Sequence, residues 1–368
     1  MRNLLPALLL LATACAGNKP IEASMAFGDH YALGPEVAVE NLTVWPVYSD
    51  QPLDIGEFRT LREAEESGEA IIRELGGAGG AQQVAQVQVR GNDNSAGAEV
   101  GRLVIENKGS LPILVCAGTI VKGGNQDRQI GQDFVVKAGT TVPVDSFCVE
   151  QGRWNGQRDG KATQGRFKVS QYMAPSSVRA SGQYRKDQGE VWKNVQQIND
   201  VRGTEGLGTS LNNATDKSDK TARETESRLA QAVRAHFAKI GPKGGQLVGF
   251  AYAINGKPVS VRTFAHNRVF SGQFDAFVHV MCMEAELDQR ATKNKTWKSS
   301  DGRDVVTMIE QIESADVEET ATSGANYNAV ANSKNGYRNF CLIEQERTNS
   351  KGEKIKQKVA LTKDWTRK

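Results

Sequence analysis

The sequence predicts an α+β fold, with a β-rich antiparallel first half followed by helices that alternate with two β-hairpins. Short apolar runs separated by Gly, Asn and Ser turns fill residues 99–149, which is typical of antiparallel strands. Apolar residues recur at helical spacing between residues 187 and 240. Asn255 and Gly256 separate two further apolar runs, as in a type I′ hairpin. No repeat of fixed period is visible, so a propeller or solenoid is not expected.

The segment before residue 99 predicts strands around one short helix. Residues 60–63 spell TLRE, which matches a capping box, and Gly68 can end the helix that follows. The glycine-rich run 76–80 predicts a flexible break. Strands are predicted at 36–50, 69–75 and 83–91.

Residues 99–150 are predicted to form an antiparallel sheet or sandwich. The runs 99–107 and 111–118 flank an NKGS turn, and residues 132–150 repeat this arrangement around KAGT. The last of these strands runs into the sequence SFCVEQGRW and leaves the sheet at Gly152. Polar side chains therefore follow the end of a strand, where they can converge in the open.

The second half predicts helices packed on hairpins. Helices with one apolar face are predicted at 187–200, 229–240, 274–285 and 305–312. Gly241 and Pro242 end the second of them. Hairpins are predicted at 246–264 and 337–361. The polar segments 155–186 and 204–219 show little periodicity and are predicted to be irregular connections.

The N-terminus predicts export and a lipid anchor. Residues 1–14 resemble a signal peptide, because Arg2 precedes an apolar run too short to span a bilayer. The run ends in LATAC, where small residues before Cys15 resemble a lipobox, so lipidation of Cys15 and a tether over 15–35 are expected. No Asp follows Cys15, so an outer-membrane location in the cell envelope is expected. The alternative is secretion after cleavage of an A-x-A site.

Length and charge limit the possible domain organisation and the possible partners. The mature chain can bury a large core, and we expect a main domain at 36–288 with a helix and hairpin extension at 289–368 packed on it. The chain has 46 basic and 43 acidic residues, for a net charge of +3. A nucleic-acid partner is therefore not expected, since such proteins show a clustered basic excess.

Four cysteines remain beyond Cys15, namely Cys116, Cys148, Cys282 and Cys341. Export allows disulfides, and a bond between Cys282 and Cys341 would tie down a tail that has few large apolar residues. Two separately buried thiols are the alternative. No C-x-x-C pair and no H-x-x-x-H spacing occurs, so neither a metal site nor a cofactor is expected.

Familiar catalytic motifs are absent from the sequence. It contains no G-x-S-x-G elbow and no G-x-x-x-x-G-K-[ST] loop. Cys148 has Arg153 nearby, which could lower the pKa of its thiol. No histidine lies near Cys148 in the sequence, so a buried structural thiol is the favoured interpretation.

Two polar stretches, GGNQDRQ at 123–129 and SFCVEQGRW at 146–154, predict a shared ligand site. An arginine fork suits phosphate or carboxylate, an indole can stack on a sugar or base, and carboxylates and amides can bind hydroxyl groups. The predicted ligand-binding residues are Gln126, Arg128, Glu150, Gln151, Arg153 and Trp154. The alternative is an internal brace, in which Glu150 pairs with Arg128 or Arg153.

These stretches, together with NLTVWPVYS, TLREAEESGEAIIREL and GFAYAINGKPVSVRTFAHNRVF, resemble the ARG and Rhodanese-Phosphatase-superfamily-associated protein domain over residues 38–288. One departure is Thr119, which stands where many family members carry an acidic residue. The family name implies an association with ADP-ribosylglycohydrolases and rhodanese-phosphatases. We therefore expect an envelope lipoprotein that binds a small polar ligand or a protein partner. The alternatives are a hydrolase of nucleotide-derived or phosphorylated substrates, or a purely structural envelope protein.

Overall fold

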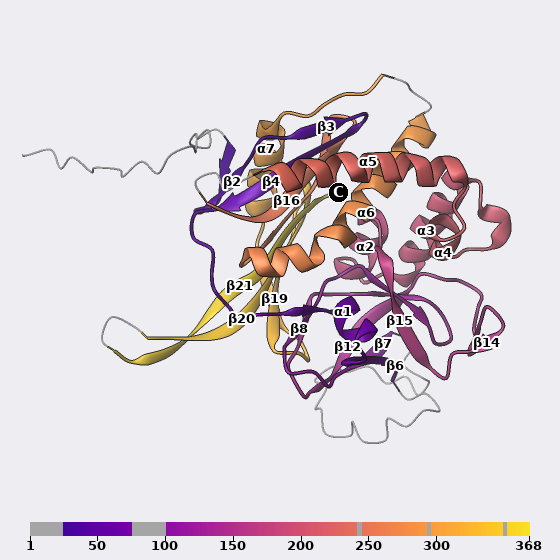
Figure 1. Ribbon diagram of the computed structural model, residues 1–368, viewed down its shortest axis with the longest axis horizontal. Coiled ribbons are helices and arrows are strands. Elements are labelled where there is room, and N and C mark those ends of the chain that lie inside the picture. The colour runs from indigo at the N-terminus through magenta and orange to yellow at the C-terminus, as the bar shows by residue number, and fades with distance from the viewer. Residues whose placement is uncertain (1–24, 76–100, 241–244, 293–295, 349–351) are drawn as a thin grey trace, which may run out of the picture.

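The computed structural model describes residues 25–75, 101–240, 245–292, 296–348 and 352–368. These residues form a large antiparallel sheet, a closed barrel and helices that pack on both (Figure 1). The predicted α+β class, with its β-rich first half, is confirmed. The predicted signal peptide, Cys15 and the strand at 83–91 lie outside the described residues.

The main sheet has ten strands and is built from both ends of the chain. Its order is β1-β2-β4-β16-β17-β21-β20-β19-β18, and β3 pairs with β4 at the side. The strands are β1 (Ala26–Phe27), β2 (Tyr31–Leu33), β3 (Val37–Val39), β4 (Leu42–Ser49), β16 (Gln246–Ile254), β17 (Lys257–Phe264), β18 (Val317–Ala321), β19 (Asn326–Asn332), β20 (Gly336–Thr348) and β21 (Lys354–Arg367). Because β17 pairs with β21, the C-terminal strands complete this sheet.

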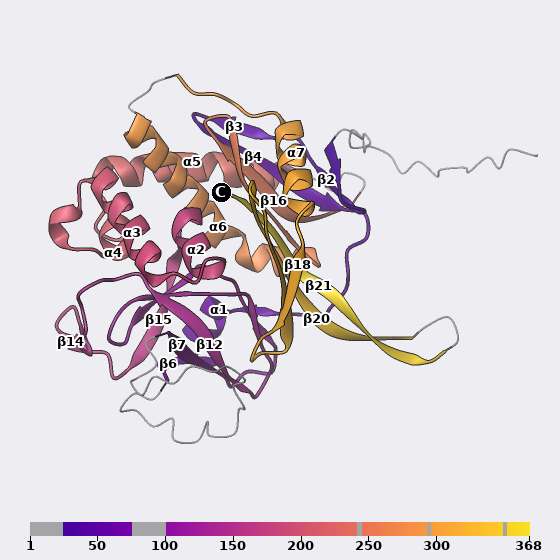
Figure 2. The same cartoon turned by 180° about the vertical axis from the view of Figure 1, so that it is seen from behind.

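Helices cover both faces of the main sheet (Figures 1 and 2). On one face, α5 (Lys220–Lys239) and α6 (Asn267–Thr292) bury residues such as Val233 and Phe277 against Phe250 and Phe264. On the other face, α7 (Gly302–Glu313) buries Ile309 among sheet residues that include Trp45 and Trp365. Both faces of the central strands are therefore buried, which explains why all eight residues of β4 are buried.

The strands predicted as a sheet or sandwich close into a six-stranded barrel in the order β10-β12-β7-β6-β15-β9. Its strands are β6 (Ala70–Glu74), β7 (Arg102–Asn107), β9 (Thr119–Gly123), β10 (Arg128–Ile130), β12 (Thr141–Cys148) and β15 (Arg166–Met173). Beside it lie a three-stranded sheet of β5 (Arg59–Thr60), β8 (Ile113–Val115) and β11 (Phe134–Val136), and a small hairpin of β13 (Gln157–Arg158) and β14 (Lys161–Ala162). Closure removes the exposed strand edges that an open sheet would leave.

Three local predictions are confirmed by backbone geometry. Helix α1 (Leu61–Glu66) begins with a complete capping box between Thr60 and Glu63. In the turn between β16 and β17, Asn255 and Gly256 have φ of 50° and 77°, as a type I′ turn requires. The predicted hairpin at the end of the chain is formed by β20 and β21.

Two segments predicted as irregular are in fact structured. Residues 155–186 contain β15, which closes the barrel, and α2 (Ser176–Gln183). Residues 204–219 contain α4 (Leu211–Thr215), which packs against α3 (Gln188–Arg202). Helix α2 was not predicted, because Arg179 and Gln183 occupy its buried face and its sequence therefore shows no apolar stripe.

Helix α6 is longer than predicted and begins at Asn267. Among the described helices, none is long and apolar enough to cross a membrane.

The four cysteines of the described segments are free, buried thiols. The predicted bond between Cys282 and Cys341 is therefore absent from the structure. Cys282 lies in the apolar layer between α6 and the sheet, whereas Cys341 accepts a hydrogen bond from Asn326 Nδ2 at 3.3 Å. Pairing of β21 with β17 holds the tail on the main sheet without a covalent link. Burial raises the pKa of Cys116 and of Cys282 to about 12.

We expect these four thiols to react with an alkylating agent at pH 8 only after denaturation. Burial excludes the reagent, and the raised pKa of the Cys116 and Cys282 thiols suppresses the reactive thiolate. Mass spectrometry of the unreduced protein, alkylated before and after unfolding, measures this directly. Detection of a peptide that links Cys282 to Cys341 would contradict the expectation.

Candidate functional site

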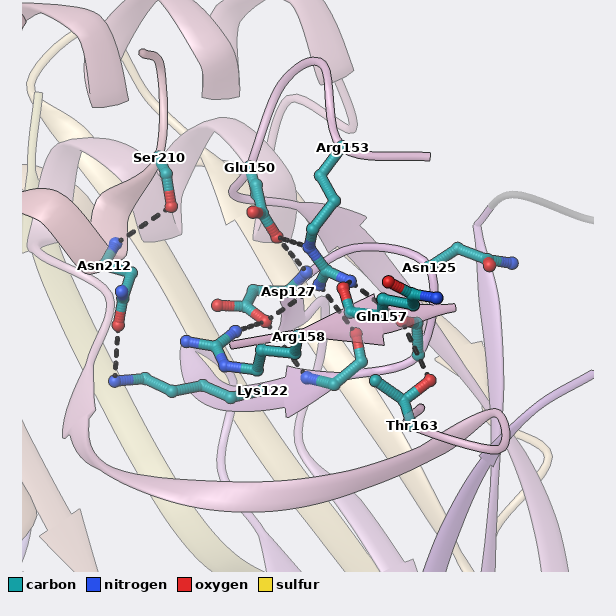
Figure 3. A network of polar contacts seen from close by, with 12 residues as sticks. Lys122, Asn125, Asp127, Glu150, Arg153, Gln157, Arg158, Thr163, Ser210 and Asn212 are labelled. Atoms are coloured by element: carbon teal, nitrogen blue, oxygen red, sulfur yellow. Dashed lines mark hydrogen bonds and ion pairs between the residues drawn. The ribbon is translucent and has the colours of Figure 1, made fainter. Parts of the chain in front are cut away.

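The two predicted stretches meet at one end of the barrel. Strand β10 pairs with β12, and the register places Arg128 opposite Cys148. The loop 124–127 before β10 therefore lies beside the loop that follows β12 (Figure 3). The backbone amide of Asp127 donates a 3.0 Å hydrogen bond to Glu150. The expected convergence in space is confirmed.

Arg153 is the centre of this corner. Its Nε donates to Glu150 Oε2 at 2.8 Å, and its Nη2 donates to Asp127 Oδ1 at 3.3 Å. It also donates to four backbone carbonyls, those of Gly123, Gly124, Asn155 and Gln157. Only 15% of its side chain is exposed. Arg153 therefore ties together both loops and the strand end, an arrangement that we call the arginine brace.

Asp127 is the buried partner of this brace, with 2% of its side chain exposed. Its Oδ1 accepts hydrogen bonds from the Gly123 amide, at 3.0 Å, and from Arg158 and Arg153. Its Oδ2 is buried and has no hydrogen-bond partner among the described residues. Burial raises the pKa of this carboxyl, and Glu150 nearby adds to the rise, although Arg158 opposes it.

The other predicted residues divide between buried and exposed positions. Arg128 is buried, contacts Cys148 Sγ, and lies 6.0 Å from the centre of the Trp154 ring. Gln126 is buried, whereas Gln151 is exposed. The backbone N–H of Gln151 donates a hydrogen bond to the Thr209 carbonyl. Trp154 leaves 53% of its surface in solvent. Since most of the polar groups bind one another, the brace accounts for this corner better than a ligand does.

Cys148 fits a structural role. It is fully buried, its amide donates to Gln188 Oε1, and its carbonyl accepts from Gln188 Nε2, both at 2.8 Å. Burial raises the pKa of its thiol, although Arg128 opposes the rise. The protonated thiol is a poor nucleophile.

A cleft of about 520 Å³ lies elsewhere, where α2, α6, β17 and the end of β21 meet. Ser177, Lys257, Glu284, Tyr337 and Arg367 are among its lining residues. A second hollow of about 460 Å³ adjoins it and shares Pro258, Arg367 and Lys368 with it. We call these the cleft and the side compartment. Cavities of this size accommodate small-molecule ligands.

The carboxylates of the cleft are already bonded to protein groups. Glu284 accepts from the Ser176 amide and from the Tyr252 hydroxyl, the latter at 2.6 Å. Asp288 accepts from Asn41 Nδ2 at 3.0 Å. In contrast, exposed Lys257 and Arg367 form no side-chain ion pair or hydrogen bond with any residue of the described segments. Lys257 and Arg367 are therefore the charged groups of the cleft that are left for a ligand.

Sequence reasoning missed this cleft. Lys257 and Arg367 are 110 positions apart in the chain, and pairing of β17 with β21 brings them together. The basic residue after the Asn255-Gly256 turn is an ordinary feature of an exposed hairpin. Among the described residues, no group of three or more His, Cys, Asp and Glu side chains is placed to hold a metal ion.

Comparison with known proteins gives one result at the level of the family. No curated protein and no solved structure matches the chain significantly. A family model does match, over residues 30–351, which extends past the resemblance seen at 38–288 and includes all of β20. Since this match spans most of the 368 residues, the chain belongs to the ARG and Rhodanese-Phosphatase-superfamily-associated Protein domain family.

Proposed function

We propose that this chain is a cell-envelope lipoprotein whose α+β domain binds a small polar ligand in the cleft. The observation that supports binding is the cleft itself, which has the volume of a ligand site and two cations, Lys257 and Arg367, without an ion-pair partner among the described residues. The start of α2, one face of α6 and four strands of the main sheet, β16, β17, β20 and β21, contribute to its walls. Walls on regular elements hold a site in place better than loops do.

Binding has more support than hydrolysis. A general acid or base needs a free oxygen within reach of the substrate. Both oxygens of Glu284 accept hydrogen bonds from protein groups, one from Ser176 and one from Tyr252. The carboxyl of Asp127 has an unbonded oxygen and a raised pKa, but that side chain is buried within the arginine brace.

Filling the cleft is expected to abolish ligand binding without unfolding the domain. Ser177 is exposed at the start of α2 and lines the cleft, so Ser177→Trp places an indole in the ligand space. The measurement is a thermal-shift screen of the mature protein against nucleotides, ADP-ribose, sugars and cell-wall fragments. A ligand at 100 times its Kd should add about 2.7 kcal/mol of stability, and Ser177→Trp should remove that gain.

The matched control is Gln231→Trp, which adds the same indole at an exposed position of α5 that does not line the cleft. The control should retain the ligand-induced shift. Equal shifts in the wild type and in Ser177→Trp would reject the cleft as the binding site.

The lipid anchor is tested separately. A Cys15→Ala variant is expected to lose acyl labelling and to leave the membrane fraction, because the acylated thiol is then absent. Labelling with a fatty-acid analogue, followed by fractionation of the cells, measures both effects. Unchanged membrane association in the variant would reject the lipoprotein proposal and leave ligand binding untouched.

A further inference from the structure

The cleft and the side compartment adjoin each other at the end of β21, where Pro258, Arg367 and Lys368 line both. We call the two together the hollow. Lys257 lines only the cleft, and Lys334 lines only the side compartment. A ligand that rests on Arg367 can therefore reach a lysine on either side.

The charges in this hollow favour an anion. Lys257, Lys334 and Arg367 are exposed, and within the described residues none of them forms a side-chain ion pair. Arg185 differs, because it donates to the Tyr337 hydroxyl at 2.8 Å and pairs with Glu190. The unpaired positive charge is thus distributed along the hollow, with Lys257 in the cleft, Lys334 in the side compartment and Arg367 at their junction. The ammonium of Lys368, which also lines both parts, lies 4.9 Å from the centre of the Tyr337 ring.

The carboxylate side chains of the hollow are already hydrogen-bonded. Asp304, in the side compartment, completes the capping box of α7 and accepts from the Asp301 amide at 3.3 Å. Glu284 and Asp288, in the cleft, accept from Tyr252 and Asn41. These bonds hold the carboxylates toward protein donors and leave the three cations to act on a ligand.

A helix N-terminus adds a second kind of anion-binding group. Helix α2 begins at Ser176 with Pro175 as its N-cap, and no side chain caps it. The amide of Ser176 is bonded to Glu284, but the following amides of the first turn have no partner within the helix. Ser177 is exposed and lines the cleft. Amides of this kind, with nearby cations, are typical of phosphate sites.

We propose that the ligand of the cleft is a phosphorylated small molecule with at least two anionic groups, which spans the cleft and the side compartment across Arg367. This inference rests on the proposed function, since it specifies the ligand of the same site. The planar fork of Arg367 binds the central anionic group. Lys257 and the first turn of α2 bind the group in the cleft, and Lys334 binds the group in the side compartment.

The test compares phosphate, pyrophosphate and tripolyphosphate as probes by calorimetric titration of the mature protein at constant ionic strength. Affinity is expected to rise with probe length, by about fivefold for each cation reached. Lys334→Gln should lower the affinity for tripolyphosphate by about fivefold and leave the affinity for phosphate unchanged. Lys257→Gln should lower the affinity for phosphate and for tripolyphosphate. Lys168→Gln, at an exposed position of the barrel strand β15, is the control and should change neither.

The outcomes separate this inference from the proposed function. Equal affinity for all three probes, with no effect of Lys334→Gln, would overturn the spanning ligand. If no phosphate probe binds but a neutral compound gives a shift that Ser177→Trp removes, the phosphorylated ligand is rejected and the cleft survives as a binding site. If Ser177→Trp leaves every observed binding event unchanged, both proposals fail.

Discussion

Replacing Asp133 with alanine is expected to lower the free energy of unfolding by about 3–5 kcal/mol. Asp133 is fully buried and accepts two hydrogen bonds from Arg262 Nη2, at 2.8 and 2.7 Å. Its oxygens also accept from the Thr362 hydroxyl and the Ala117 amide. The variant leaves the buried Arg262 guanidinium without this partner, and removing one member of a buried ion pair is far costlier than replacing both.

Chemical denaturation monitored by circular dichroism measures the loss. The matched control is the double variant Asp133→Ala/Arg262→Met, which removes both charges and puts an apolar chain beside Phe277, whose ring lies 5.2 Å from the guanidinium. The double variant is expected to be more stable than the single one. A loss below about 1 kcal/mol for Asp133→Ala would contradict the expectation, since exposed pairs contribute that little.

This buried pair also bears on the cleft. Asp133 precedes β11 in the barrel half of the molecule, whereas Arg262 and Thr362 belong to β17 and β21 of the main sheet. A second buried pair, Arg179 with Asp364 at 2.6 Å, joins α2 to β21. Burial of Asp364 acts to raise the pKa of its carboxyl, but Arg179 and Arg262 outweigh this and the pKa lies below its usual value. The first pair ties the segment before β11 to β17 and β21. The second fixes α2 relative to β21, the two elements that carry Ser177 and Arg367 in the cleft.

Local signals made part of the fold predictable. The capping box at Thr60 and the Asn255-Gly256 turn fix backbone geometry within a few residues, so the sequence shows them directly. Strands β18 and β19 gave no such signal. All five residues of β18 are exposed, while β19 buries Asn326 and Asn328, whose amides donate to the Asp133 carbonyl. Polar residues that are buried through specific hydrogen bonds reverse the apolar alternation on which strand prediction depends.

The same distinction applies to the candidate sites. The corner around Arg153 was predictable because its two stretches lie at the ends of β10 and β12, which are neighbours in the barrel. The cleft was not, because its residues come from α2, α3, α6 and four strands of the main sheet, and only the complete sheet and its helices bring them together. The sequence also does not distinguish a lysine or arginine that lines a cleft from one on the open surface. Lys257 differs from other exposed lysines only through what surrounds it in three dimensions.

Replacing Arg153 with lysine is expected to lower the free energy of unfolding by about 2–3 kcal/mol and to leave ligand binding in the cleft unchanged. A lysine keeps the charge but presents its donors from one nitrogen, so it cannot serve Glu150, Asp127 and four carbonyl groups at once. Each buried acceptor that loses its donor lowers the free energy of unfolding by about 1–3 kcal/mol. At the partly exposed edge, water can replace some of the lost donors. Denaturant titration and calorimetric titration with tripolyphosphate measure the two properties.

Trp154→Ala is the control that separates a brace from a ligand platform. The indole is 53% exposed and its ring lies 6.0 Å from the Arg128 guanidinium, so its removal should cost about 1 kcal/mol or less. A brace requires that Arg153→Lys destabilise the protein clearly more than Trp154→Ala does. If both variants instead keep wild-type stability and lose binding of a common ligand, the corner is a binding site, as the sequence alone predicted. The six contacts of Arg153 with protein groups favour the first outcome, because a guanidinium with this many protein acceptors has little capacity left for a ligand.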